Sequence, residues 1–194
     1  MTAVEVVFLI FVSVFAIAGV VRGFLRELGV TIVMVATLFA LDRLIPLVEQ
    51  FIRQGQLQSL GLQPYTGPVP VDAVTRTTLT VIFGVLTLTA TFIAYQGETL
   101  AFEGTPPRFP LGGLLGLLVG AVNGYLIVGT LWWLLDHYGY PLDIVHLPLS
   151  PLGQEIVRNG LLPLELLGGG TQSGDSLGLL PVILIVLIIL RVVR

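Results

Sequence analysis

The sequence predicts an all-α fold: a polytopic membrane bundle of four core transmembrane helices plus a C-terminal fifth. Of its 194 residues, 55% are hydrophobic and only 11% are charged, whereas a soluble domain carries about 25% charged residues. The apolar residues are also gathered into runs long enough to cross a bilayer, and segments rich in proline, glycine and polar side chains separate these runs.

The first two apolar runs predict spans over about residues 4–21 and 28–47. Ala16-Ile17-Ala18 fits a signal-peptidase site, but no arginine or lysine precedes the run. We therefore expect a retained helix and not a cleaved leader. The intervening Arg22–Glu27 segment is so short that we expect the two helices to form a tight antiparallel hairpin.

The third span is predicted over about residues 77–95, after a turn-rich loop that follows a short interfacial helix at 48–60. Small residues recur along this span at the three-and-four spacing of one helix face. This small-residue stripe consists of Thr77, Thr80, Gly84, Thr87 and Thr91. Such a face allows a neighbouring helix to pack closely, and its hydroxyl groups can bond across or along the helix.

The fourth span is predicted over residues 111–135. Four glycines recur within it at a spacing of four: Gly112, Gly116, Gly120 and Gly124. On a helix this GxxxG spacing makes a continuous groove of bare backbone. In a bilayer such a groove allows another helix to approach closely. We expect the third span to dock there, although a second copy or another membrane protein would also fit.

Residues 136–178 form the longest polar region and mix Leu-Pro pairs with glycines. We expect an extramembrane or interfacial segment without a core of its own, a short helix over 154–162 and a flexible tether over 166–178. Residues 179–194 contain the last apolar run, which we expect to cross the membrane as a single helix.

Five spans place the two termini on opposite sides of the membrane, and the positive-inside rule selects the orientation. One side holds five arginines, mostly in short segments: Arg22, Arg26, Arg108, Arg191 and Arg194. The other side holds four, spread over longer loops: Arg43, Arg53, Arg76 and Arg158. The N-terminus is therefore expected outside and the C-terminus inside.

Over residues 1–135 the chain resembles the CvpA family, the colicin V production proteins of bacterial inner membranes. Three features carry the resemblance: Glu5 opening the first helix, the Arg22-Gly23-Phe24-Leu25-Arg26-Glu27 turn, and a later helix that opens with Leu111-Gly112 and continues in G-x-x-x-G steps. The family usually has an aspartate before that helix, which is absent here. The resemblance implies an integral membrane protein of the bacterial cytoplasmic membrane, loosely linked to toxin export and envelope physiology.

The charged residues at the two ends of the first span allow more than one interpretation. Glu5 is a proton or ion site, or an interfacial carboxylate that the helix dipole favours, and we favour the second. Arg22, Arg26 and Glu27 bind an anionic lipid headgroup or a partner, or they set the topology and form an Arg–Glu pair.

Asn123 is the only amide in the glycine helix. It lines a polar path or makes a structural hydrogen bond to a threonine of the third span, and we favour the hydrogen bond. His137 and His146 lie outside the expected spans and lack a second ligand at metal-binding spacing. We therefore expect no metal or haem ligation. The acidic residues of the loop, such as Asp136 and Glu165, are expected on a solvated surface.

No Walker loop, dinucleotide fingerprint or zinc motif is present, so we expect no enzyme and no cofactor. The net charge of −3 offers no basic surface for nucleic acid. The leading hypothesis is a non-catalytic scaffold or accessory partner that contacts lipids and other membrane proteins through helix packing. One alternative is an accessory subunit of a respiratory or photosynthetic electron-transfer complex. A second alternative is a small transporter or channel, although few intramembrane charges are present to support it.

Overall fold

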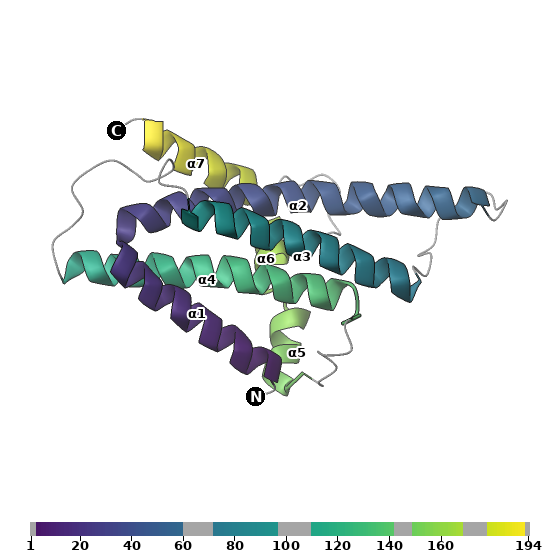
Figure 1. The fold of residues 1–194 in the computed structure, drawn as a ribbon, viewed down its shortest axis with the longest axis horizontal. Coiled ribbons are helices and arrows are strands. Elements are labelled where there is room, and N and C mark those ends of the chain that lie inside the picture. The colour runs from purple at the N-terminus through teal and green to yellow at the C-terminus, as the bar shows by residue number, and fades with distance from the viewer. Residues whose placement is uncertain (1–2, 60–71, 97–109, 142–148, 169–177, 193–194) are drawn as a thin grey trace.

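The computed structural model describes residues 3–59, 72–96, 110–141, 149–168 and 178–192, and throughout these ranges the regular structure is helical (Figure 1). The helices are α1 (Ala3–Arg22), α2 (Phe24–Ser59), α3 (Ala73–Gln96), α4 (Leu111–His137), α5 (Pro151–Arg158), α6 (Pro163–Gly168) and α7 (Leu180–Val192). The predicted all-α bundle is therefore confirmed.

Four of these helices are long and apolar enough to cross a membrane. The candidate spans are Val4–Arg22, Phe24–Ile52, Ala73–Gln96 and Leu111–His137. They agree with the four spans expected from the sequence, and they make the chain a multi-pass membrane protein.

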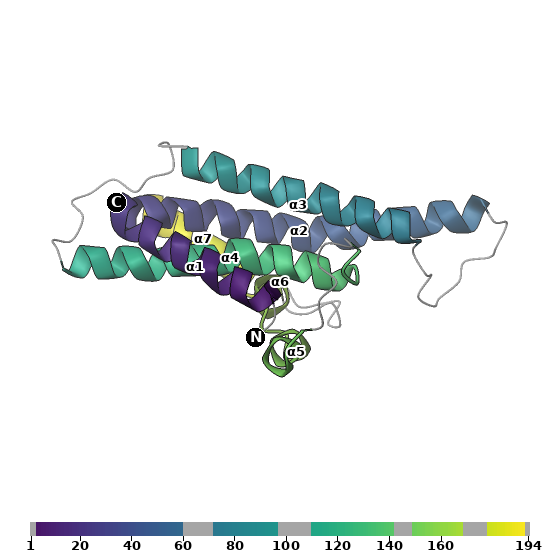
Figure 2. The same cartoon turned by 60° about the horizontal axis from the view of Figure 1, so that its bottom comes forward.

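The helices α2, α3 and α4 lie side by side along the long axis, while α1 crosses α4 obliquely (Figures 1 and 2). Between α1 and α2 the chain reverses at Gly23, whose φ of +88° suits glycine. After this turn α1 diverges from α2 and packs most extensively on α4. The expected tight hairpin of the first two helices is therefore wrong, because α4 offers α1 a closer surface than α2 does.

The second helix runs for 36 residues to Ser59 and includes Pro46. The expected break near residue 47, with a separate interfacial helix over 48–60, is wrong. Pro46 removes one backbone hydrogen bond, but its neighbours on both sides hold the helix against the bundle. Ile45 is buried in the core, and the carboxylate of Glu49 lies 2.9 Å from the ring of His137 on α4.

The helix predicted over 154–162 corresponds to α5, which begins and ends earlier, and a second short helix, α6, follows it and reaches into the predicted tether. The Ser150 side chain caps α5 by accepting a hydrogen bond from the Gly153 amide at 3.3 Å. Beyond α5, α6 packs against both α2 and α4, and Pro163 lies against Gly129. Part of the predicted surface segment thus inserts into the bundle. His146 and residues 169–177 of the predicted tether lie outside the described residues.

The last helix, α7, has 13 residues. At about 1.5 Å per residue it extends for about 20 Å, which is short of the roughly 30 Å hydrocarbon core. The described helix is therefore shorter than the single crossing predicted for residues 179–194, and this fifth crossing stays a prediction. Its start is tied to the end of α6, because the Leu179 amide donates to the Leu167 carbonyl at 2.8 Å. From there α7 runs along α2 (Figure 1).

Candidate functional site

Three glycines of α4 form a backbone-to-backbone contact with α1. A Cβ at Gly116 would collide with the carbonyl oxygen of Gly19. A Cβ at Gly120 would lie 3.0 Å from the Gly19 Cα, and one at Gly124 would lie 2.9 Å from the Phe15 Cβ. The groove predicted from the glycine spacing exists, and α1 fills it. Gly112, at the start of α4, is partly exposed.

The expectation that the third span fills this groove is wrong. The first helix occupies the groove instead, through Gly19 and Phe15, while Phe83 of α3 is buried in the core of the bundle. A Cβ at Gly84 would meet open space. Gly84 therefore belongs to no close helix contact.

The threonines of α3 nevertheless face the bundle. Thr80 and Thr87 are buried, and each hydroxyl donates to a backbone carbonyl one turn earlier, at Arg76 and Phe83. The Thr91 hydroxyl donates to the Thr87 carbonyl at 2.8 Å and lies 3.6 Å from the Met34 sulfur of α2. These hydroxyl groups donate to backbone carbonyls of their own helix and not to α4.

The polar centre of the bundle is Glu27, whose side chain is fully buried in the first turn of α2. The Asn123 amide of α4 donates to the Glu27 Oε2 at 2.8 Å and to the Glu27 backbone carbonyl at 2.9 Å. The Tyr95 hydroxyl of α3 donates to the same Oε2 at 3.1 Å. A buried carboxylate requires partners of this kind, because burial otherwise costs several kcal/mol.

Arg22, the last residue of α1, supplies the compensating charge. Its Nη1 lies 3.5 Å from the Glu27 Oε1, and its Nη2 donates to the Tyr95 carbonyl at 3.1 Å. The guanidinium also lies over the Tyr95 ring, 4.3 Å from the ring centre. The Thr31 hydroxyl lies 2.8 Å from the Asn123 Oδ1 and 3.0 Å from the Glu27 carbonyl, and these two acceptors share its proton.

We name this cluster the four-helix junction, since it draws side chains from α1, α2, α3 and α4: Arg22, Glu27, Thr31, Tyr95 and Asn123. It contains the Arg–Glu pair that the sequence suggested. Asn123 makes an interhelical hydrogen bond as expected, but its partners belong to α2 and not to α3. Arg26 is exposed outside the junction.

Glu5 is also buried, with only 3% of its surface exposed. Its Oε1 accepts hydrogen bonds from the Ser150 amide at 3.0 Å and the Ser150 hydroxyl at 2.6 Å. A Cβ at Gly153 would collide with the same carboxylate. The expected interfacial carboxylate of α1 is therefore an internal contact to the N-terminus of α5, where a helix favours negative charge.

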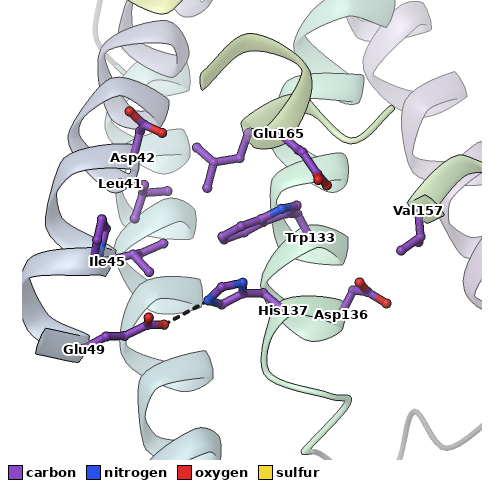
Figure 3. A pocket seen from close by; sticks show the side chains of 11 residues that line it. Leu41, Asp42, Ile45, Glu49, Trp133, Asp136, His137, Val157 and Glu165 are labelled. Carbon is purple, nitrogen blue, oxygen red and sulfur yellow. Dashed lines mark hydrogen bonds and ion pairs between the residues drawn. The ribbon is translucent and has the colours of Figure 1, made fainter. Parts of the chain in front are cut away.

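An acidic cavity of about 280 Å³ lies between α2, α4 and α6, with Val157 of α5 at its edge (Figure 3). Its polar lining consists of Asp42, Glu49, Asp136, Glu165 and His137, and Trp133 forms one wall. Asp136 and Glu165 were expected on a solvated surface; Glu165 is exposed, whereas Asp136 is partly buried. Arg43 lies 3.6 Å from Asp42.

Aromatic side chains cluster at the C-terminal end of α4. The Trp132 indole donates to the Tyr140 hydroxyl at 3.0 Å. Burial raises the pKa of Tyr140 to about 12. Burial, and then the Glu49 carboxylate, also raises the pKa of Tyr138. Both tyrosines therefore stay neutral near pH 7.

No family model matches this chain, and no curated protein or solved structure is significantly similar to it. Its site is therefore interpreted from its own geometry. Within the ranges that the structure describes, no group of three or more His, Cys, Asp or Glu residues could hold a metal ion. The polar clusters instead join helices to one another.

Sequence reasoning missed several partners in these clusters. Ala16 and Gly19 are spaced by three, which places small residues on one face of α1, and this spacing is the sequence signal for the partner of the glycine groove. Tyr95 ends an apolar span, and that position carries no signal for a contact with Glu27. Ser150 is followed by Pro151, a combination typical of a helix start, but nothing in the sequence indicates that Glu5 is its partner.

Proposed function

We propose that this chain is a non-catalytic scaffold or accessory partner of the bacterial cytoplasmic membrane that acts through helix packing. The four-helix junction carries the proposal. It uses buried polar side chains to hold four long helices in one arrangement, with Arg22 and Glu27 compensating each other's charge. Catalysis or ion transfer would instead need such groups to face a substrate or a path.

The outer surface of the bundle supports the same function. Apolar side chains dominate the exposed faces of α1, α3 and α7, including Val14, Ile17, Val85, Phe92, Ile185 and Ile189. In a membrane such faces contact lipid tails or the helices of another protein. A rigid interior with an apolar exterior suits a protein that binds other membrane proteins.

The resemblance of residues 1–135 to the CvpA family supports the bacterial inner membrane as the location. The arginine distribution supports an N-terminus outside and a C-terminus inside. The α1–α2 turn and the end of α7 lie toward the same end of the bundle (Figure 1), and both carry arginines, Arg22 and Arg26 at the turn and Arg191 on α7. This arrangement agrees with one arginine-rich cytoplasmic side.

Purification from native membranes in a mild detergent tests the proposal. We expect the tagged chain to migrate with another integral membrane protein, identified by mass spectrometry. Phe92→Asn on the exposed face of α3 should weaken this association without lowering the unfolding temperature. Co-migration with a large electron-transfer complex would favour the accessory-subunit alternative. A chain that purifies alone, without a cross-linked partner in intact membranes, contradicts the scaffold function.

The acidic cavity is the observation that favours transport as a second candidate function. Its lining holds four carboxylates and His137, contributed by α2, α4 and α6. Flux into liposomes that contain the purified chain tests this candidate. Glu49→Gln, Glu5→Gln and Asn123→Leu should each change the flux if a path exists, and equal flux with and without protein counts against transport.

A further inference from the structure

The acidic cavity combines apolar walls with carboxylates and one indole N–H. Aliphatic side chains from α2, α5 and α6 form much of its lining: Leu41, Ile45, Val157 and Leu164. Four carboxylates accompany them, from α2, α4 and α6 (Figure 3). The volume of about 280 Å³ is close to the lower limit for small-molecule sites, which share this mixture of apolar surface and a few polar groups.

Trp133 gives an observation that is independent of the carboxylates. Its side chain lines the cavity and is only 7% exposed. The indole of the neighbouring Trp132 donates to Tyr140, but no residue that the structure describes accepts a hydrogen bond from the Trp133 indole. The Trp133 nitrogen is also not fully enclosed by the described protein atoms. Its N–H therefore faces the space of the cavity, and a donor buried in this way requires an acceptor.

The charge of the lining favours a cation. Its four carboxylates belong to Asp42, Glu49, Asp136 and Glu165. The only lining residue able to carry a positive charge is His137, 2.9 Å from Glu49. Arg43 lies 3.6 Å from Asp42 but is not part of the lining.

The spacing of these carboxylates distinguishes between two kinds of cation. Within the described ranges, no three His, Cys, Asp or Glu side chains lie close enough to hold a metal ion. A metal ion needs several oxygen ligands at one point, whereas these carboxylates are distributed along the walls. Such an arrangement suits an extended organic cation.

We propose that the acidic cavity binds a small organic ammonium ion that has an apolar body and a neutral hydrogen-bond acceptor. The ammonium group pairs with the carboxylates, the apolar body contacts the aliphatic lining, and an acceptor such as a hydroxyl oxygen receives the Trp133 N–H. An anionic acceptor is unsuitable, because the four carboxylates repel it. The inference names a ligand class for the cavity behind the transport candidate, and it is independent of the scaffold function.

Three probes with the same six-carbon chain test the proposal: aminohexanol, hexylamine and hexanediol, each with its functional groups at the chain ends. Isothermal titration calorimetry of the full-length chain in a non-ionic detergent measures their affinities, with empty micelles as the blank. We expect aminohexanol to bind about tenfold or more tightly than the uncharged hexanediol, because hydrogen bonds to charged groups are the stronger ones. Equal affinities for these two probes, or no binding of aminohexanol above the blank, overturn the proposal.

Glu165 and Glu155 provide matched variants for the charge. Both are exposed residues of short helices, but only Glu165 lines the cavity. Glu165→Gln should weaken the binding of aminohexanol about two- to fivefold. Glu155→Gln loses the same charge and should bind like the wild type. Equal losses in the two variants would show attraction by general surface charge and overturn the site.

Trp133→Phe tests the acceptor, because it removes the N–H and keeps an aromatic ring. It should lower the affinity for aminohexanol relative to that for hexylamine, which has no hydroxyl group, by about two- to tenfold. The ratio of the two affinities cancels a general loss of packing in the variant. An unchanged ratio overturns the pairing of the acceptor with Trp133. Binding is measured at equilibrium, so these results are separate from those of the flux and co-purification experiments.

Discussion

Glu27 shows how a charged side chain persists inside an apolar bundle. Its carboxylate is completely buried, and donors from two other helices and the guanidinium of Arg22 surround it. The turn at Gly23 makes this pairing possible. A φ of +88° reverses the chain there and brings the end of α1 beside the first turn of α2. No Cβ collision occurs at Gly23, so its backbone conformation and not its size requires glycine.

Replacing Asn123 tests the hydrogen bonds of the junction. Asn123→Leu removes two donated hydrogen bonds to Glu27 and the acceptor near Thr31. We expect the free energy of unfolding to fall by about 1–3 kcal/mol for each buried group left without a partner. Denaturant unfolding in detergent measures the loss. Leu118→Ile, on the exposed face of the same helix, should unfold like the wild type.

A double-mutant cycle tests the charge pair. Glu27→Leu leaves Arg22 without its carboxylate and is expected to destabilise the bundle by about 3–5 kcal/mol. Adding Arg22→Met removes the unpaired charge, so the double variant should be more stable than Glu27→Leu alone. Additive effects of the two substitutions would show that the pair contributes no coupling.

At the scale of whole helices, the α1–α4 contact shows what sequence spacing predicts. Four-residue steps of glycine predicted a groove on α4, and Gly116, Gly120 and Gly124 form it. The spacing carries no information about which helix enters the groove. In the structure the helix that enters is α1, whose Gly19 allows its backbone to meet that of Gly116 and Gly120.

Two alanine substitutions distinguish a glycine in a close helix contact from a glycine that faces open space. Gly120→Ala places a methyl group against the Phe15 carbonyl and the Gly19 backbone, so we expect a loss of about 1–3 kcal/mol. Gly84→Ala meets open space and should be neutral or improve stability by up to about 1 kcal/mol. Thermal unfolding of both variants gives the comparison. Equal effects would show that the groove is not packed against α1.

The contact between Glu5 and Ser150 predicts the behaviour of α5. Ser150→Ala removes both the helix cap and a hydrogen bond to Glu5, with an expected cost of about 0.5–2 kcal/mol. Hydrogen–deuterium exchange over residues 150–158 should accelerate in this variant and in Glu5→Gln. Ser13→Ala is the control, since the Ser13 hydroxyl bonds only within α1, to the Leu9 carbonyl, at an exposed position.

At the scale of the whole molecule, the four long spans could be predicted because apolar length alone identifies them. The C-terminal region could not, because its packing depends on contacts between distant segments. Tyr125 of α4 donates to the Leu161 carbonyl at 2.6 Å, and Pro163 lies against Gly129. Neither contact has a local sequence signal. Together they bring α6 into the bundle and place the start of α7 beside it.

Cysteine labelling tests whether α6 and α7 together complete a fifth crossing. The chain has no native cysteine, so a maleimide labels only the cysteine that each single substitution introduces. Arg26→Cys and Arg191→Cys should react with an impermeant maleimide from one side of the membrane, and Gln54→Cys from the other. If Arg191→Cys reacts from the same side as Gln54→Cys, α7 does not cross the membrane.

The contact between Glu5 and Ser150 also has a consequence for biogenesis. Its two residues are separated by 145 positions, and at about 5–20 residues per second the ribosome needs about 7–30 seconds to make the intervening chain. During this interval α1 is in the membrane with a carboxylate that has not met its partner, and the glycines of α4 emerge only late. The earliest helix therefore completes its packing only after α5 has been made, and chains truncated before α5 should be preferred targets of membrane quality-control proteases.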